Sequence, residues 1–492
     1  MTHATASGHI QAYFLIVVAL LLAGLMTGRN LATWPIRLGY PGEENFNEGV
    51  QLAEMVRLRQ GVRIYRPASP GQFDPANYGP LYYLLGARLV NPEAPSYFPL
   101  RMVSVVGTLG CGAGCAVLAF WLAGSALAAI LAALVFLSYG FVSLYGLSVR
   151  CDLVGVCLMF WGFLVAYRFR HSGALLAAVP LMLLAFFYKQ QFVAGPLAVL
   201  IFLLLERRTW LATRFVGLLG AGGLGLLGLF QFAVFRRQAF LAHFLLYNMQ
   251  PFFWPLFRQL AFVFAAVLLI PLLLGIELLR SYTQRLLTCY LGCAVVLGLV
   301  TAGKQGSDVN YFLESVLILS ALAPALLVKR LEDPARAGVV LLGLALTVFL
   351  AQWPTSNAPR PQDFARDRAV HDYLRQHFPP HTRAFSLFTG DLIRAGLDLP
   401  ISDLFIYTWL TRQGILSDRE LLAELGDRRF GVILVNFNLE RNEPLRYSQD
   451  YLTKAIRQAI VARYHVAASL EMPAPEKIDP DDRFYVWAPN YY

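Results

Sequence analysis

The sequence predicts an α-helical polytopic membrane protein with about eleven transmembrane helices, followed by a small C-terminal α/β domain outside the membrane. Hydrophobic residues make up 57% of the 492 residues and charged residues only 15%, whereas a soluble domain carries about a quarter charged residues. The mean hydropathy is +0.52. Residues 1–353 hold 24 Lys and Arg against 13 Asp and Glu, and residues 354–492 hold 17 against 18. We therefore expect a membrane domain over 1–353 and a separate domain over 354–492, with the boundary near Trp353-Pro354.

Apolar stretches of about 20 residues, long enough to cross a bilayer, recur along the first part of the chain. Lys189-Gln190-Gln191 divides one long apolar run into two short spans. The first stretch has no basic segment before it and no Ala-x-Ala-like site after it, so we expect no cleaved signal peptide. The eleven expected spans cover residues 12–28, 102–122, 125–145, 153–169, 174–188, 191–205, 214–235, 259–279, 286–302, 311–328 and 337–353.

Basic residues in four short loops predict the orientation, because such loops stay in the cytoplasm. These loops follow the fourth, sixth, eighth and tenth spans, so they share one side of the membrane. The N-terminus is then cytoplasmic, while loop 29–101 and residues 354–492 are extracytoplasmic, in a multi-pass protein of the plasma (inner) membrane. The excess positive charge belongs to these loops and does not indicate nucleic-acid binding. The basic loop residues are Arg168, Arg170, Arg207, Arg208, Arg214, Arg280, Arg285, Lys329, Arg330 and Arg336.

The first external loop contains two expected interfacial helices. Residues 47–60 place apolar side chains on one helical side, which is typical of a helix lying on the membrane surface. Pro80 suits the first turn of a second helix, with Tyr82 and Tyr83 at headgroup level.

Residues 354–492 alternate between helical and extended patterns, which indicates a small α/β domain. We expect helices at 363–377, 419–425 and 451–464, and strands at 383–388, 430–436 and 483–487. No glycine-rich phosphate-binding loop occurs there, so this domain is expected to be accessory.

The six cysteines, all in the first 353 residues, lie in apolar surroundings without nearby histidines. Cys111 and Cys115, like Cys289 and Cys293, have helical i,i+4 spacing. We expect them to pack between helices and not to hold a metal.

Ionisable and amide side chains near the spans gather on the external side. Such residues at membrane depth are costly and indicate function. Their shared side predicts an external active-site cavity. They are Glu43, Glu44 and Glu48 in the first loop, Arg150 and Asp152 before span four, Lys189 and Gln190 between spans five and six, and Lys304, Asp308, Asn310 and Glu314 at spans nine and ten.

The order of these motifs resembles the GT-C glycosyltransferases, in particular the group of protein O-mannosyltransferases and lipid A aminoarabinose transferases. That group has an Asp-Glu pair after the first membrane helix and a Pro-Pro-Leu-type element before a later interfacial helix. Here the pair is Glu43-Glu44 and the element is Gly79-Pro80-Leu81. Arg150-x-Asp152 and Lys189-Gln190 resemble two further landmarks, and residues 304–314 resemble a motif of an uncharacterised bacterial branch.

The resemblance implies transfer of a hexosyl or pentosyl group from a polyprenyl-phosphate sugar to an extracytoplasmic glycan, lipid or protein, with inversion. Glu43 or Glu44 would be the base that activates the acceptor hydroxyl, although either one can instead cap the next helix. Lys189, Lys304 and Arg150 would bind the donor phosphate. Their alternatives are snorkelling to the interface for the lysines and a structural ion pair with Asp152 for Arg150.

The remaining candidates are substrate-binding residues. Asp152, Gln190, Asp308, Asn310 and Glu314 would bind sugar hydroxyls or the acceptor, although Asp308 equally suits a helix cap. Tyr78 and Tyr82 would stack on the sugar or the lipid, or else anchor the loop at the interface.

The sequence establishes no cofactor with certainty, and a divalent metal ion at the donor phosphate is one of two open alternatives. Some GT-C enzymes place a divalent metal between carboxylates and the phosphate, whereas others use Arg and Lys. Two other classes also remain: a transporter or flippase, which would place charges at the midplane and usually show inverted repeats, and a non-enzymatic scaffold.

Overall fold

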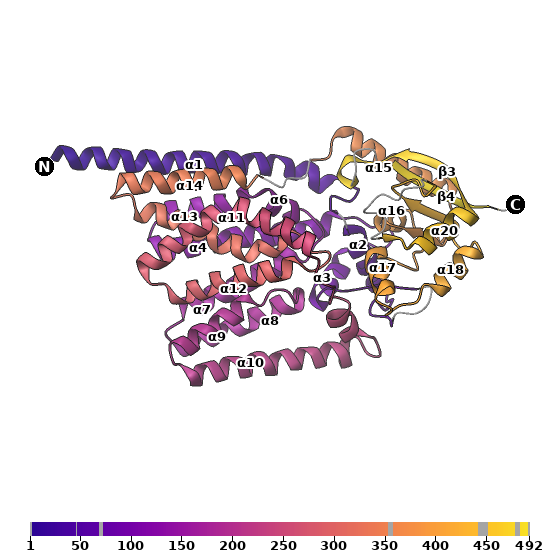
Figure 1. Cartoon of the computed structure of the whole chain (residues 1–492), viewed down its shortest axis with the longest axis horizontal. Coiled ribbons are helices and arrows are strands. Elements are labelled where there is room, and N and C mark those ends of the chain that lie inside the picture. The colour runs from indigo at the N-terminus through magenta and orange to yellow at the C-terminus, as the bar shows by residue number, and fades with distance from the viewer. Residues whose placement is uncertain are drawn as a thin grey trace. The chain divides into compact units, whose positions relative to one another are not determined.

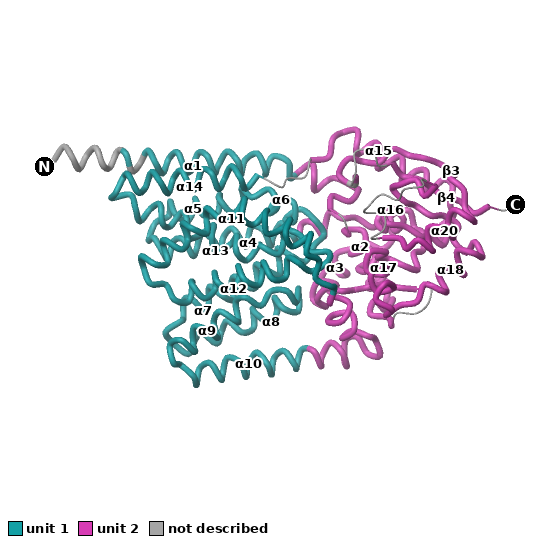
Figure 2. The backbone as a smooth tube through the Cα atoms, viewed as in Figure 1, with its two compact units in different colours: residues 1–34, 103–226, 250–356 teal, residues 35–102, 227–249, 357–492 magenta. Residues whose placement is uncertain are grey.

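The computed structural model describes residues 2–45, 47–67, 72–352, 358–440, 451–477 and 483–490. Two compact units are distinguished in Figure 2. Unit 1 contains residues 1–34, 103–226 and 250–356, and unit 2 contains residues 35–102, 227–249 and 357–492. The predicted boundary at Trp353-Pro354 lies outside the described residues, so the division into 1–353 and 354–492 stays a prediction.

Unit 1 is helical, and each of the eleven predicted apolar stretches falls on a helix or a pair of consecutive helices (Figure 1). The first helix, α1, continues past this unit to Gly39. The elements are α1 (Thr2–Gly39), α4 (Phe98–Ala123), α5 (Ala126–Ser138), α6 (Gly140–Gly146), α7 (Asp152–Arg168), η1 (Gly173–Ala178), α8 (Val179–Tyr188), α9 (Ala194–Leu205), α10 (Thr209–Gly228), α11 (Trp254–Tyr282), α12 (Arg285–Ala302), η4 (Val309–Phe312), α13 (Leu313–Lys329) and α14 (Pro334–Leu350).

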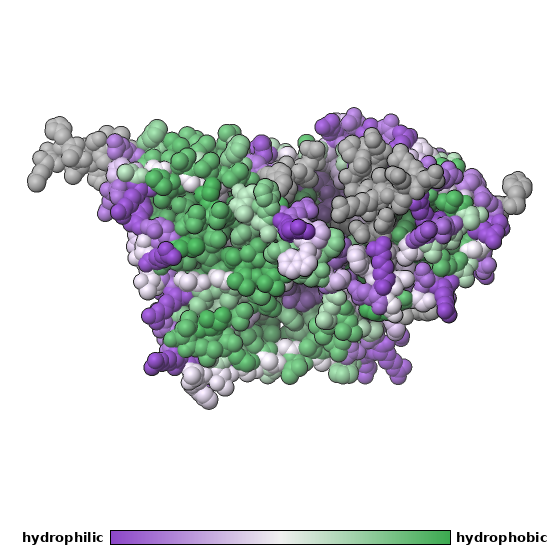
Figure 3. Space-filling view, in the orientation of Figure 1, coloured by the Kyte–Doolittle hydropathy of each residue, from purple (hydrophilic) through white to green (hydrophobic). Residues whose placement is uncertain are grey.

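Within the described residues, six helices are long and apolar enough to cross a membrane. The predicted span 125–145 is a seventh candidate made of two helices, α5 and α6, bent by 74°. Tyr139 causes the break, since its extended backbone (φ −66°, ψ 124°) ends the helical ladder. The four other predicted spans, α7, α8 with η1, α9 and α14, are apolar helices of 17 residues or fewer. Apolar side chains cover most of the face of unit 1 seen in Figure 3.

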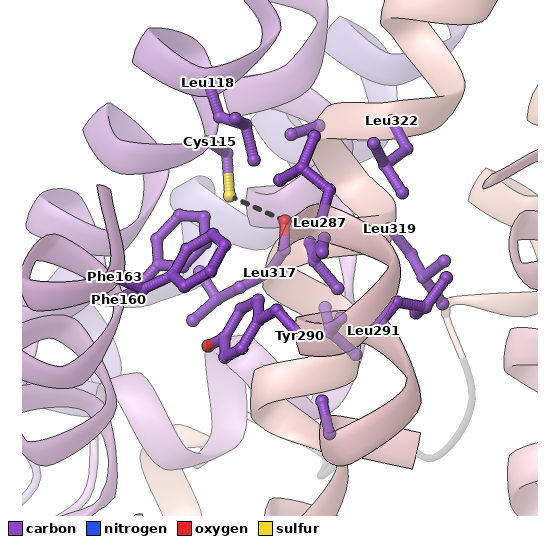
Figure 4. Close-up of a cluster of buried hydrophobic side chains, with 14 of the residues drawn as sticks. Cys115, Leu118, Phe160, Phe163, Leu287, Tyr290, Leu291, Leu317, Leu319 and Leu322 are labelled. Atoms are coloured by element: carbon purple, nitrogen blue, oxygen red, sulfur yellow. Dashed lines mark hydrogen bonds between the residues drawn. The ribbon is translucent and has the colours of Figure 1, made fainter. Parts of the chain in front are cut away.

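The interior of unit 1 centres on α13, whose apolar window is 89% buried, against 11% for α10. The rings of Phe163 and Tyr290 stack at 4.0 Å between centroids, and the Cys115 thiol donates to the Leu317 carbonyl at 3.3 Å (Figure 4). All six cysteines are free.

Unit 2 combines helices from the first loop, a segment between α10 and α11, and an α/β fold from the C-terminal part. The helices are α2 (Glu48–Arg59), α3 (Pro80–Leu89), the π-helical turns η2 (Leu229–Val234) and η3 (Ala242–Leu246), α15 (Pro361–His377), α16 (Thr389–Arg394), α17 (Leu404–Arg412), α18 (Arg419–Gly426), α20 (Lys454–Arg463) and the short η5 (Ala474–Glu476). The strands are β1 (Ala384–Ser386), β2 (Val432–Val435), β3 (Tyr464–Glu471) and β4 (Arg483–Pro489).

The four strands form one mixed sheet in the order β1-β2-β4-β3. Strand β1 pairs in parallel with β2, while β4 is antiparallel to both β2 and β3. Because side chains alternate along a strand, Ile433 and Val435 enter one hydrophobic cluster with α17 and α20, and Val432 and Leu434 enter a second cluster with α15. Both faces of the sheet are therefore covered, as expected for an α/β domain.

The three predicted C-terminal strands and three predicted helices are present, whereas α16, α17 and β3 were not predicted and the helix predicted over 451–464 is shorter at both ends. The helix predicted to reach Tyr464 ends at Arg463, and β3 begins at Tyr464. This strand escaped prediction because it is an alternately exposed edge strand rich in Ala and Ser, without the β-branched run that marks a buried strand.

The two loop helices occur at the predicted positions but are more buried than an interfacial helix. All residues of α2 from Glu48 to Val56 are buried, including charged and polar ones. Tyr82 and Tyr83 of α3 are also buried, at 5% and 0% exposure. The helices thus pack within unit 2 on several sides.

Candidate functional site

The acidic loop after α1 is organised by the guanidinium of Arg101, which is completely buried near the start of α4. Arg101 donates to the carbonyls of Arg37, Tyr40 and Gly42 at 3.1, 2.6 and 2.7 Å. It also bonds both carboxylate oxygens of Glu48, at 3.1 and 2.7 Å. Such forked pairs fix orientation as well as adding energy. Arg101 therefore sets the path of the backbone that carries Glu43 and Glu44.

Glu44 is held in a buried ion pair. Its Oε2 accepts from Arg37 Nε at 2.5 Å, and its amide nitrogen donates to Glu48 Oε2 at 2.6 Å. Burial raises the pKa of Glu44 above its ordinary value, against the opposing effect of Arg37 and Arg101. Because the Glu44 carboxylate is occupied by Arg37, Glu44 suits a structural role.

Glu43 is also buried, but no ion pair of Glu43 occurs among the described residues. Its Oε1 accepts from the amide of Gly390, at 3.2 Å, in α16. Burial raises the pKa of Glu43 to about 8, and the nearby carboxyls of Asp391 and Glu48 add to this effect. Glu43 is therefore the better candidate for proton transfer near neutral pH.

A second charged group in α2 was missed by sequence reasoning. Arg57 contacts Asp74 and donates to the carbonyl of Leu399 at 2.5 Å, while the Glu54 carboxyl accepts from the Ser402 hydroxyl at 3.0 Å. Burial raises the pKa of Glu54. These contacts connect α2 to the segment before α17. They were not predicted because the amphipathic pattern of α2 indicated that its charged side chains face solvent.

In unit 1 the structure brings three of the predicted site residues together around a fourth, Asp152. Asp152 Oδ1 bonds Lys189 Nζ and accepts from Asn310 Nδ2 at 2.6 Å. Arg150 Nε lies 3.5 Å from Asp152 Oδ2. These side chains come from the start of α7, the end of α8 and the turn η4. The motifs that were separate in the sequence thus meet in one buried cluster.

Two tyrosines that the sequence did not mark extend this cluster. The Tyr145 hydroxyl donates to Asp308 Oδ2 at 2.6 Å, and Arg150 lies 5.6 Å from the centre of the Tyr145 ring. Asp308 also caps η4 by accepting from the Val309 amide at 2.8 Å, the alternative role that its position allowed.

Lys189 lies 5.6 Å from the centre of the Tyr311 ring, and the Tyr311 hydroxyl interacts with Lys304. Tyr311 is therefore placed between the two lysines. Three cations, Arg150, Lys189 and Lys304, accompany two carboxylates, Asp152 and Asp308, so the region carries a net positive charge.

The other predicted residues of unit 1 are Glu314 and Gln190. Glu314 accepts from the Tyr290 hydroxyl at 3.3 Å, so it does not share a partner with Asn310. Gln190 follows Lys189 and is half-buried. In unit 2, the Tyr78 and Tyr82 rings meet edge to face at 5.9 Å, and Tyr82 is buried against Tyr83.

Besides the charged group of α2, sequence reasoning missed Arg101, Tyr145 and Tyr311. Arg101 precedes an apolar span, where a basic residue normally indicates a loop, and tyrosines near a membrane boundary normally indicate anchors. Within the described residues, no group of three or more His, Cys, Asp or Glu side chains is arranged to hold a metal ion.

The comparisons with known proteins agree with this architecture. No protein-family model matches the chain, and no curated protein matches it in sequence. The structure of ArnT from Cupriavidus metallidurans in the apo state is similar over 94% of this chain and 97% of that chain, with a TM-score of 0.57 and 11% identity. The same protein bound to undecaprenyl phosphate gives a TM-score of 0.55 and 11% identity over 95% and 98% of the two chains. The chain therefore has a GT-C-like polytopic helical fold, as the resemblance of its motifs implied.

Proposed function

We propose that the protein is an inverting membrane glycosyltransferase that uses a polyprenyl-phosphate sugar as donor. The observation that carries this proposal is the buried, net-positive cluster around Asp152, Lys189 and Arg150 in a chain with the fold of ArnT, which binds undecaprenyl phosphate. A phosphate monoester or diester needs this kind of charge compensation when it leaves with its electrons.

In the proposed reaction, Glu43 takes the proton from an acceptor hydroxyl. The acceptor oxygen then bonds to the anomeric carbon from the face opposite the phosphate, and the bond from that carbon to the phosphate oxygen breaks. The electron pair leaves with the lipid phosphate, where Lys189, with Lys304 or Arg150, stabilises the charge. Asp152 and Asn310 hold Lys189 in place.

The acceptor is proposed to be an extracytoplasmic glycan, lipid or protein. The protein itself is proposed to lie in the plasma (inner) membrane with its N-terminus in the cytoplasm. The unit-2 α/β fold has the role of an accessory cover or acceptor guide. Asp308, Gln190, Glu314, Tyr78 and Tyr82 remain proposed substrate contacts at the positions described above.

The test is incubation of the purified protein with a panel of polyprenyl-phosphate sugars and candidate acceptors, followed by mass spectrometry of donor and product. The expected result is loss of the sugar from one lipid donor with formation of free polyprenyl phosphate. Turnover of nucleotide sugars alone would contradict the donor class, and lipid translocation without sugar transfer would indicate a flippase instead.

A further inference from the structure

The carboxyl group of Glu43 lies in a cradle made by two glycines of unit 2. Its Oε1 accepts from the Gly390 amide of α16 at 3.2 Å, and it also accepts from the Gly49 amide of α2. A Cβ added at either glycine would collide with the Glu43 carboxyl, and at Gly49 also with the Gly390 backbone. The two backbones therefore approach as closely as only glycine permits.

The C-terminal end of helix α16 is also held in place, through its last residue, Arg394. Arg394 forms a forked pair with Asp367, with both nitrogen–oxygen distances 2.8 Å. It also donates to the carbonyl of Pro41 at 2.6 Å, two residues before Glu43. The Tyr97 hydroxyl lies where a Cβ on Gly390 would project. Tyr97 therefore bounds a further side of the cradle around the Glu43 carboxyl.

This arrangement conflicts with the role of Glu43 as a base. A general base must reach the proton that it removes at hydrogen-bond distance, yet Glu43 is 7% exposed and its oxygen is occupied by backbone donors. Its raised pKa, about 8, also keeps it protonated at neutral pH in this state.

We propose that α16 is an autoinhibitory cover: while Gly390 holds the Glu43 carboxyl, the base is sealed from the acceptor, and withdrawal of α16 exposes and activates it. This inference rests on the proposed function for its catalytic meaning. The sealed state itself is a property of unit 2 that can be measured without any sugar donor.

The experiment measures labelling of Glu43 in the full-length protein by a water-soluble carbodiimide and an amine, with quantification by peptide mass spectrometry. Asp398, whose side chain is 62% exposed, is the internal reference. In the unmodified protein, Glu43 should react much more slowly than Asp398. Gly390→Ala should raise Glu43 labelling by about tenfold. Glu43 reacts only in the open form, and the population of a sparsely populated open form can increase by roughly that factor.

Gly426→Ala is the matched control, because a Cβ at this glycine of α18 meets open space. It should leave Glu43 labelling unchanged. If Gly390→Ala fails to fold, Arg394→Lys tests the same cover, since it keeps the charge but loses the forked pair with Asp367. The double variant Gly390→Ala/Tyr97→Phe lacks the Tyr97 hydroxyl that collides with the new Cβ. Its Glu43 labelling should therefore move back toward the level of the unmodified protein.

Transfer activity gives the second readout. The rate should rise in Gly390→Ala together with labelling, while the pH at which the rate reaches half its maximum should fall. The charged and titratable groups facing Glu43 are Glu48 from α2, Asp391 from α16 and Tyr97 before α4, so these variants leave them in place, apart from Tyr97→Phe.

The outcomes separate this inference from the proposed function. Rapid labelling of Glu43 in the unmodified protein, or increased labelling with a reduced rate, would overturn the autoinhibitory cover. Full activity of Glu43→Gln would overturn the assigned base, while leaving the labelling result valid as a measure of the sealed state.

Discussion

Single side chains distinguish the two members of the acidic pair. Glu44 is paired with Arg37 at 2.5 Å, whereas Glu43 contacts backbone amides. The sequence predicts the pair, but it does not distinguish the two, because only the folded loop brings Arg37 beside Glu44.

Glu43→Gln is expected to lower the rate of sugar transfer by about 10²–10⁴-fold, the usual loss when a general base is removed. The protein should remain folded, because glutamine keeps the hydrogen-bond acceptor and Glu43 is protonated near neutral pH. Initial rates and thermal unfolding together check this.

Glu44→Gln is expected to act mainly on stability, because removing one partner of a buried ion pair costs about 3–5 kcal/mol. The measurement is the melting temperature of the purified protein. A stable protein with a rate reduced as in Glu43→Gln would show that the roles of the two residues are exchanged.

Lys189→Ala is expected to weaken binding of undecaprenyl phosphate by about tenfold to a hundredfold, because a hydrogen bond to a charged group contributes about 1.5–3 kcal/mol. Binding can be followed by native mass spectrometry or by competition with a labelled lipid phosphate. Lys329→Ala, at the end of α13 over the Tyr282 ring, is the control and should bind normally. Equal affinity of both variants for undecaprenyl phosphate would show that Lys189 does not bind the phosphate.

Among the elements, the loop from α1 to α2 depends on a residue far along the chain. Arg101 holds three carbonyls and the Glu48 carboxylate. Arg101→Ala should destabilise the protein by about 3–5 kcal/mol, since it leaves Glu48 buried without its partner. Hydrogen exchange should increase first at residues 40–45 and in α2. Arg88→Ala, an exposed position in α3, should change neither property.

Stability of unit 2 should also depend on pH. The fold raises the pKa of Glu43 from 4.5 to about 8, and burial raises that of Glu54. Such carboxyls bind protons more tightly in the folded state than in the unfolded state, so their stabilising effect is complete below the unfolded pKa and is lost as the pH rises through the folded pKa. The melting temperature should therefore fall between about pH 5 and about pH 9. Glu54→Gln should reduce this slope, and an unchanged slope in both Glu54→Gln and Glu43→Gln would contradict the assignment.

The elements also show what the sequence can predict. Apolar runs located every helix of unit 1, because a bilayer requires long apolar stretches whatever the packing. The amphipathic pattern of residues 47–60 predicted an interfacial helix, although the residues of α2 from Glu48 to Val56 are buried. Burial of charges by Arg101, Arg57 and Ser402 depends on partners distant in sequence, which no local pattern displays.

For the whole molecule, the sequence predicts which residues belong to a site more reliably than what each one contacts. Arg150, Asp152, Lys189 and Asn310 were selected because they lie near the external ends of the spans and because they belong to motifs that resemble those of the family; they form one cluster of hydrogen bonds and ion pairs. Glu314, selected by the same argument, bonds Tyr290 instead. The predicted side of the membrane tells only at which end of a helix a residue lies. The direction of its side chain depends on how the neighbouring helices are rotated.

The orientation in the membrane is a prediction that concerns the whole chain. Reporter fusions at residue 172, between α7 and η1, and at residue 360, before α15, should report opposite compartments. The first position follows a basic loop expected in the cytoplasm. The same compartment for both fusions would contradict the predicted topology.

The hydrogen bond between Glu43 and Gly390 has a consequence for the order of synthesis. The two residues are 347 positions apart, while Glu48 and Arg101 are 53 apart. A ribosome therefore completes the loop that carries Glu43 early, as soon as the second membrane helix has begun to emerge. The carboxyl group then stays in water until most of the polypeptide has been made, and it is enclosed only when the last part of the chain folds. A nascent chain that stalls after α14 would carry a finished acidic loop with its Glu43 ionised and uncovered.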